Sequence, residues 1–214
     1  MAIITPYRAT EVDSLSASLS GVLRAGGVVA LPTETYYGLG ANPFDAAAID
    51  RLLAVKGRPD GKPILVLIGD RAQLDGLVGH VPPAAKALME AYWPGPLTIV
   101  FPANNRLPAN LTAGTGTVGI RLTSCGPLAD LLRRIGPLTG TSANRSGAPP
   151  VQTAQDVNLS LGNEVALIVD AGMTPGGLPS TVVSICDGVT ILREGAIAPL
   201  DIEKTLTAQG LHLQ

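Results

Sequence analysis

The sequence predicts an α/β fold built on a twisted, mixed β-sheet flanked by helices. Apolar runs rich in β-branched residues alternate along the chain with stretches of helical periodicity, which is typical of this class. Near the C-terminal end, Asp187-Gly188 lies between two β-rich runs and indicates a hairpin, so the sheet is expected to contain antiparallel pairs as well. With 46% hydrophobic but only 3% aromatic residues, the core is expected to be mainly aliphatic.

The individual elements follow from these patterns in chain order. Strands are expected at residues 27–32, 63–68, 97–101, 118–122, 165–170, 180–185 and 189–193. Helices are expected at about residues 10–25, 45–55, 70–78, 83–92, 126–135 and 199–209. Asp45 can cap the second of these helices and Gly57 can end it, with a buried stripe of Ile49, Leu52 and Leu53.

Length and composition exclude several classes of protein. The 214 residues suit one domain, taken as residues 1–214, and the net charge of -2 gives no overall field for nucleic acid. Two cysteines and two histidines match neither a disulfide framework nor a zinc site, so no metal ligands are assigned. Without a signal peptide or a long apolar run, the expectation is a soluble, cytoplasmic protein.

Two short motifs resemble nucleotide-binding fingerprints and are rejected. The segment GTGTVG (114–119) has the spacing of a dinucleotide fingerprint, but a strand follows it where that motif needs a helix. The segment GRPDGKP (57–63) is one residue short of a P-loop, and Pro63 stands where a magnesium-binding hydroxyl is required.

The segment KGRPDGKP (56–63) concentrates three cations, Lys56, Arg58 and Lys62, on a stiff turn with two glycines. Arginine offers a planar fork to phosphate oxygens and lysine offers a point charge, so the turn could bind an anion. It could equally be a solvated turn whose cations compensate the dipole at the end of the preceding helix. The segment alone leaves these two interpretations open.

Other polar residues stand at strand ends or inside strands. Ser142 and Asn144 of TSANRSG (141–147) would share a face if extended, although a simple polar turn explains them as well. Thr33 follows a strand, where α/β folds commonly place ligands. Glu34 could serve as a base, but the sequence shows no carboxylate partner for it.

Two arginines interrupt apolar strands. Arg121 lies inside TVGIRL (117–122), where a cation must be paired, face a ligand or lie on an exposed edge strand. Arg193 repeats the pattern at the end of the last strand, and Ser180 begins the strand before it. Histidine is too scarce for a nucleophilic triad, so the inventory favours a site that binds and orients anionic substrates by electrostatics.

Seven segments together resemble a known family. PTETYYGLGAN, AVKGRPDGKPILVLI, YWPGPLTIVF, TVGIRL, TSANRSG, STVV and ILREGAI occur in the order and spacing of the YrdC-like threonylcarbamoyl-AMP synthases, in their short single-domain form. The resemblance covers about residues 10–200 and implies a YrdC-like fold with a large, positively lined cavity. It also implies a nucleotidyltransferase that converts L-threonine, bicarbonate or CO2 and ATP into threonylcarbamoyl-AMP and pyrophosphate, aided by Mg²⁺.

The resemblance also implies a role for each matching residue. Lys56 and Arg58 would act on the ATP phosphates as catalytic residues, and the other nucleotide contacts would be Lys62, Thr117, Ser142, Asn144 and Arg193. Threonine would be held by Thr33, Arg121, Gly140 and Ser180, with the arginine on its carboxylate. The product would pass to a threonylcarbamoyl transferase complex that modifies tRNA, and direct tRNA binding has little support.

This sequence departs from the family pattern at several positions. Leu67 replaces a common histidine, Cys125-Gly126 replaces a His-Pro pair, Pro179 replaces a glutamate, and PPVQT (149–153) replaces a Ser-Pro-Thr segment. Two alternatives stay open beside the synthase. One is an RNA-binding module, since the same cavity could bind RNA, and the other is a paralogue that acts on another carbamoyl substrate, which the changes at Leu67 and Pro179 keep open. The 214 residues are expected to hold the synthase core without the second domain that longer members of the family carry.

Overall fold

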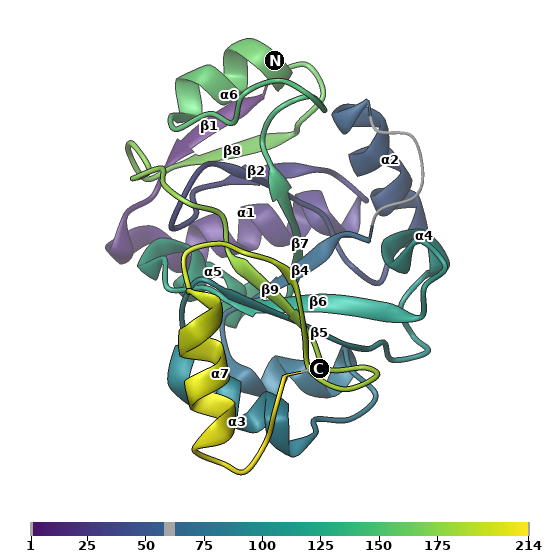
Figure 1. The fold of residues 1–214 in the computed structure, drawn as a ribbon. Coiled ribbons are helices and arrows are strands. Elements are labelled where there is room, and N and C mark those ends of the chain that lie inside the picture. The colour runs from purple at the N-terminus through teal and green to yellow at the C-terminus, as the bar shows by residue number, and fades with distance from the viewer. Residues whose placement is uncertain (1, 58–62, 214) are drawn as a thin grey trace.

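The computed structural model describes residues 2–57 and 63–213, which form one ten-stranded mixed sheet with helices around it (Figure 1). The strand order is β1-β8-β2-β3-β7-β4-β6-β5-β9-β10, with parallel and antiparallel pairs. This architecture confirms the predicted fold class.

The strands are short and come from the whole length of the chain. Their bounds are β1 (Ile3–Pro6), β2 (Val29–Leu31), β3 (Gly38–Gly40), β4 (Leu65–Ile68), β5 (Leu97–Pro102), β6 (Thr117–Leu122), β7 (Leu138–Ser142), β8 (Leu167–Asp170), β9 (Thr181–Ser184) and β10 (Thr190–Arg193). The last two pair antiparallel across the loop that holds Asp187 and Gly188, which confirms the predicted hairpin.

The helices surround the sheet. Their bounds are α1 (Val12–Arg24), α2 (Ala46–Lys56), α3 (Pro83–Tyr92), α4 (Ala109–Thr112), α5 (Gly126–Ile135), α6 (Ala154–Leu161) and α7 (Pro199–Thr207), with 3-10 helices η1 (Ala9–Glu11) and η2 (Arg71–Gly76). The carboxylate of Asp45 accepts from two backbone N–H groups of α2, and Gly57 ends that helix at φ 57°, as predicted. Of the predicted stripe, Ile49 and Leu52 are buried, whereas Leu53 is half-buried.

Several elements are absent from the sequence-based prediction. β1, β3, β7, α4 and α6 were not expected, and the helix predicted at 70–78 is the 3-10 helix η2. β3 contains only Gly-Leu-Gly, which carries no β-propensity signal, yet it joins the two halves of the sheet by pairing with β2 and β7. These strands gain their stability from pairing with neighbours that are distant in sequence.

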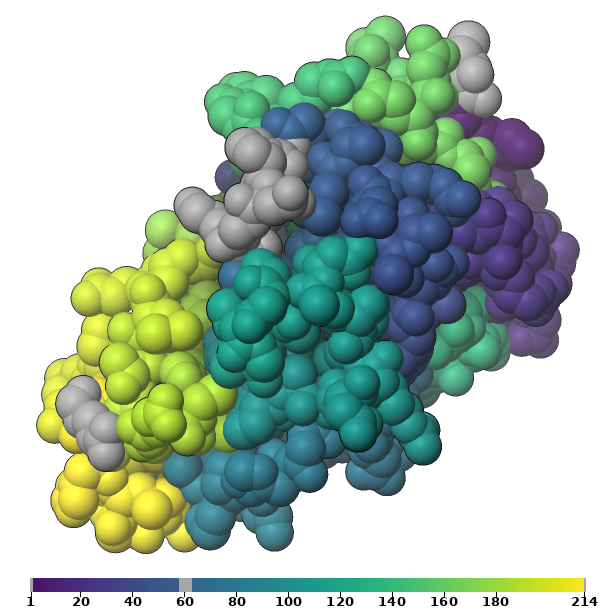
Figure 2. Space-filling view, turned by 90° about the vertical axis from the view of Figure 1, so that its right-hand side faces the viewer, coloured from purple at the N-terminus to yellow at the C-terminus, as the bar shows by residue number. Residues whose placement is uncertain are grey.

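The sheet separates two hydrophobic cores. α1 and α5 pack on one face through a leucine-rich cluster that includes Leu19, Leu131 and Leu138, and the larger core lies on the other face. At the edge of the larger core, α2 and α4 lie side by side, as the blue and teal segments of Figure 2 show, and Asn110 donates to Asp50 over 2.7 Å between them. No helix of the described part is long and apolar enough to cross a membrane.

Candidate active site

A cavity of about 910 Å³ opens on the sheet face that also carries α1 and α5. Leu67 shows that the two lie on the same face, because its side chain belongs both to the leucine-rich core under these helices and to the cavity wall. The alternation of β6 explains how the cavity acquires polar groups. One face of the strand lines the cavity and the other is buried in the larger core, so that Thr117, Gly119 and Arg121 alternate with Val118, Ile120 and Leu122.

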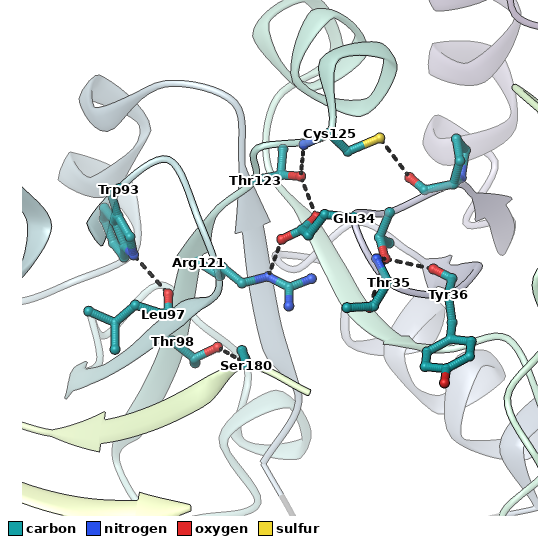
Figure 3. Close-up of polar contacts among 12 residues, drawn as sticks. Glu34, Thr35, Tyr36, Trp93, Leu97, Thr98, Arg121, Thr123, Cys125 and Ser180 are labelled. Carbon is teal, nitrogen blue, oxygen red and sulfur yellow. Dashed lines mark hydrogen bonds and ion pairs between the residues drawn. The ribbon is translucent and has the colours of Figure 1, made fainter. Parts of the chain in front are cut away.

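Arg121 is paired inside the protein and also faces the cavity. Its Nε lies 3.2 Å from Oε1 of Glu34, an ion pair whose alignment is not that of a directed hydrogen bond. The other oxygen of Glu34 accepts from the Thr123 hydroxyl over 2.8 Å (Figure 3). Arg121 is only 7% exposed, and the carboxylate of Glu34 offsets the cost of burying its charge.

Ser180 links two other walls of the cavity. Its hydroxyl lies 2.9 Å from that of Thr98, on β5. Nη2 of Arg193 donates to the Ser180 hydroxyl over 3.1 Å and to its carbonyl oxygen over 2.8 Å. Burial, followed by the positive charge of Arg121, lowers the pKa of Arg193, so the two guanidinium groups are close enough to repel. An anion bound between them would relieve this repulsion.

Lys56, the last residue of α2, is 5% exposed. Its ammonium group donates to the carbonyl oxygens of Ser142 and Asn144, over 2.6 Å in each case. The side-chain amide of Asn144 donates to the carbonyl of Arg145 over 3.0 Å. Lys56 therefore fixes the loop that follows β7 in space.

The predicted residues fall into three groups. Those that line the cavity are Thr33, Thr117, Arg121, Gly140, Ser142, Ser180 and Arg193. Lys56 and Asn144 lie behind Ser142 and contact each other. Arg58 and Lys62 lie outside the described residues.

Gly140 and Thr33 are fixed by local packing and hydrogen bonding. A Cβ atom on Gly140 would lie 2.7 Å from Cγ of Leu67, so a larger residue there would force the Leu67 side chain or the strand to shift. The hydroxyl of Thr33 donates to the carbonyl of Tyr36 over 2.6 Å and accepts from the backbone N–H of Thr35. Thr33 is thereby held in a tight turn at the cavity wall.

Sequence reasoning missed two contributors. The pairing of Glu34 with Arg121 joins segments that are distant in the chain, and no local signal reveals it. Thr98, by contrast, interrupts an apolar strand at a position that alternates with Leu97 and Ile99, and period-two reasoning could have placed it on the cavity side.

The fold and the cavity define an α/β protein whose sheet lines one cavity with guanidinium groups, hydroxyls and glycines. The family model Sua5/YciO/YrdC, described as "Telomere recombination", matches residues 21–195. The chain belongs to this family.

Individual relatives carry a more specific description. The threonylcarbamoyl-AMP synthase of Thiobacillus denitrificans is 42% identical over 182 residues, which cover 85% of this chain and 96% of that protein. The enzyme of the same name from Bacillus subtilis is 39% identical over 210 residues, covering 92% of this chain and 61% of the relative. This chain thus spans less than two thirds of the longer relative.

A solved structure gives the same picture of the fold. The crystal structure of Pyrococcus abyssi Sua5 complexed with L-threonine matches at a TM-score of 0.88 and 33% identity. The match covers 100% of this chain and 62% of that one. The fold expected from the resemblance is therefore confirmed.

Proposed function

We propose that this chain is an L-threonylcarbamoyladenylate synthase, a nucleotidyltransferase that forms threonylcarbamoyl-AMP and pyrophosphate from L-threonine, bicarbonate or CO2 and ATP. The observation that carries the proposal is the convergence of Thr33, Arg121 and Ser180 on one cavity. The threonine complex of Sua5 and the names of the relatives agree with it. The proposal treats residues 1–214 as one synthase domain.

The amino-acid subsite lies around Arg121. The guanidinium binds the threonine carboxylate, and the hydroxyl groups of Thr33 and Ser180 and the backbone at Gly140 surround the rest of the molecule. Charge-assisted, two-point contacts of this kind fix both the position and the direction of a carboxylate. The free amine is thereby held toward the nucleotide side of the cavity.

The nucleotide subsite adjoins the amino-acid subsite in the same cavity. Thr117, Ser142 and Arg193, which line the cavity, are assigned to ATP. Lys56 and Asn144 hold the end of β7, where Ser142 lies. Arg58 and Lys62, in the segment between α2 and β4, complete the assignment as phosphate-binding cations. Arg58 acts on the reacting phosphate directly, whereas Lys56 acts on it through the backbone at Ser142 and Asn144 that its ammonium group holds. Cations placed at the phosphates stabilise the charge that develops on the leaving group.

The reaction needs positioning more than a nucleophilic side chain. The threonine amine attacks CO2 and loses a proton to solvent, forming a carbamate. A carbamate oxygen then attacks the α-phosphorus of ATP, the bond from that phosphorus to the bridging oxygen breaks, and pyrophosphate leaves with the electron pair. The guanidinium and hydroxyl groups of the cavity orient both anions for this displacement.

Magnesium was predicted to assist, but the described residues do not build a site for it. Within residues 2–57 and 63–213, no three His, Cys, Asp or Glu side chains gather closely enough to hold a metal ion. None of the described lining residues is a carboxylate. We therefore assign no step to a metal, although Mg²⁺ commonly reaches such sites on the phosphates of a nucleotide.

The proposal also covers where the enzyme works and where its product goes. The adenylate would pass to a threonylcarbamoyl transferase complex that acts on tRNA, and the enzyme would work in the cytoplasm. Pyrophosphate release from ATP, measured with and without L-threonine and bicarbonate, tests the proposal. Pyrophosphate release that requires both L-threonine and bicarbonate supports the proposal. Release that does not change when one of them is left out contradicts it.

A further inference from the structure

We propose that Glu34 is a positioning residue that holds the Arg121 guanidinium by its Nε edge and so directs its terminal edge toward the substrate carboxylate. The identity of that substrate rests on the proposed function. The positioning role rests on contacts within the protein.

The carboxylate of Glu34 is engaged at both oxygens. Oε1 lies 3.2 Å from Nε of Arg121, and Oε2 accepts from the Thr123 hydroxyl over 2.8 Å. That hydroxyl in turn accepts from the backbone N–H of Cys125 over 3.1 Å. The chain of contacts therefore runs from the start of α5 through Thr123 and Glu34 to Arg121 (Figure 3).

The geometry of β6 explains why Arg121 and Thr123 meet the same carboxylate. Thr123 directly follows the strand, so it lies two residues beyond Arg121, on the same side of the extended chain. Glu34 approaches from the segment between β2 and β3. One carboxylate therefore fixes the arginine relative to two separate parts of the fold.

A guanidinium group has two edges that can meet a planar anion. One is formed by Nε with a terminal nitrogen, and the other by the two terminal nitrogens. Glu34 lies at Nε and leaves the second edge for a ligand. Among the described residues, neither terminal nitrogen of Arg121 makes a hydrogen bond, and Figure 3 draws no contact to either of them.

Burial strengthens this arrangement. The side chains of Arg121 and Glu34 are 9% and 13% exposed, so the pair is poorly screened by water. Removing the carboxylate would leave a buried cation without compensation, and the guanidinium would turn toward other acceptors.

The alternative role for Glu34, as a general base, fits the contacts less well. Glu34 is not among the described residues that line the cavity, and its carboxylate is engaged by the ion pair with Arg121 and the hydrogen bond from Thr123. A base must reach the proton that it removes. Glu34 therefore acts on the substrate through Arg121.

Calorimetric binding to the full chain tests the role without requiring turnover. The ligands are L-threonine, L-threoninamide, which lacks the carboxylate, and ATP. Glu34→Gln should weaken L-threonine binding about tenfold or more, as expected for losing the orientation of a charge-assisted pair. Binding of L-threoninamide and ATP should change less than about twofold, whereas a merely structural defect would weaken all three ligands.

Matched variants separate the contacts. Thr123→Val should reproduce the loss and Thr123→Ser should restore binding, while Glu11→Gln, which breaks the exposed pair with Arg8, should have no effect. The chemical shift of the Arg121 Nε–H NMR signal should change in Glu34→Gln and remain unchanged in Glu11→Gln.

The outcomes are distinct for the two proposals. Unchanged L-threonine affinity and an unchanged Arg121 signal in Glu34→Gln would overturn the positioning role, as would a wild-type protein that binds L-threonine no better than L-threoninamide. Glu34-dependent threonine binding without threonylcarbamoyl-AMP formation would instead contradict the proposed function and support the positioning role.

Discussion

The Arg193 guanidinium donates to both oxygens of Ser180: to the carbonyl over 2.8 Å and to the hydroxyl over 3.1 Å. The proposal assigns Arg193 to the nucleotide and Ser180 to threonine. This contact therefore joins the two subsites directly, and binding of one substrate is expected to influence the other.

A double-mutant cycle measures this connection. Arg193→Met and Ser180→Ala should each weaken L-threonine binding, and their effects should fail to add by about 0.5 to 3 kcal/mol because both remove the contact between the Arg193 guanidinium and the Ser180 hydroxyl. Calorimetry gives all four affinities. Arg106→Met, at an exposed position, serves as the control and should change affinity less than about twofold. Strictly additive losses would show that the contact carries no coupling.

Lys56 should contribute to stability as well as to activity. Lys56→Met removes an ammonium group that donates to the carbonyl at the end of β7 and to one in the loop that follows. It should lower the free energy of unfolding by about 2 to 4 kcal/mol. Urea denaturation measures this loss. Lys86→Met, at an exposed position on α3, should stay within about 0.5 kcal/mol. A stable but inactive Lys56→Met would instead indicate that the ammonium acts directly on the substrate.

Gly140 is predicted to be required by packing. In Gly140→Ala the new Cβ would lie 2.7 Å from Cγ of Leu67 and 2.8 Å from Cδ1 of Leu65, which should cost about 1 to 3 kcal/mol of stability. Chemical denaturation provides the measurement. Shortening the neighbour in Gly140→Ala/Leu67→Ala should cost less than the sum of the two single changes.

Gly126 offers a matched comparison, since nothing lies within 4 Å of a Cβ built there. Gly126→Ala should not lower stability. If Gly140→Ala is equally neutral, then the glycine serves only the approach of the ligand to the backbone.

Tyr37 should make the protein sensitive to alkaline pH. It is fully buried and donates to the carbonyl of Gly172 over 2.8 Å, and burial raises its pKa to about 12. The folded state then keeps a proton that the unfolded state loses near pH 10, so stability is intact below pH 10 and falls as pH rises toward 12. The loss should approach about 2 to 3 kcal/mol.

Free energies of unfolding measured from pH 8 to 12 test whether stability falls with rising pH in this range. Tyr37→Phe should be less stable at pH 8, because its hydrogen bond is lost, but should show a flatter decline above pH 10. An equally steep decline in Tyr37→Phe would assign the pH dependence to other groups.

The sequence-based prediction succeeded where local chemistry decides. The Asp45 cap, the glycine that ends α2 and the hairpin at Asp187-Gly188 depend on neighbouring residues, and the structure has each of them. Arg121 was expected to be paired, to face a ligand or to lie on an edge strand. It is paired with Glu34 and faces the cavity. The edge-strand alternative is wrong, because β6 lies inside the sheet, between β4 and β5.

The prediction was incomplete where partners come from distant segments. The sequence offered two interpretations of Lys56, as a phosphate ligand or as a cation compensating a helix end, and its contacts with carbonyls of Ser142 and Asn144 were not foreseen. β7, which leads to those carbonyls, is Leu-Thr-Gly-Thr-Ser and was not recognised as a strand. Its place in the sheet depends on antiparallel pairing with β3 and β4.

The most direct test of the central claim is mass spectrometry of the product formed from ATP, L-threonine and ¹³C-labelled bicarbonate. The proposed reaction predicts threonylcarbamoyl-AMP carrying one labelled carbon, formed together with pyrophosphate. If ATP is consumed without a labelled threonylcarbamoyl-AMP, or if no product forms while the purified chain binds both substrates, the proposed function is contradicted.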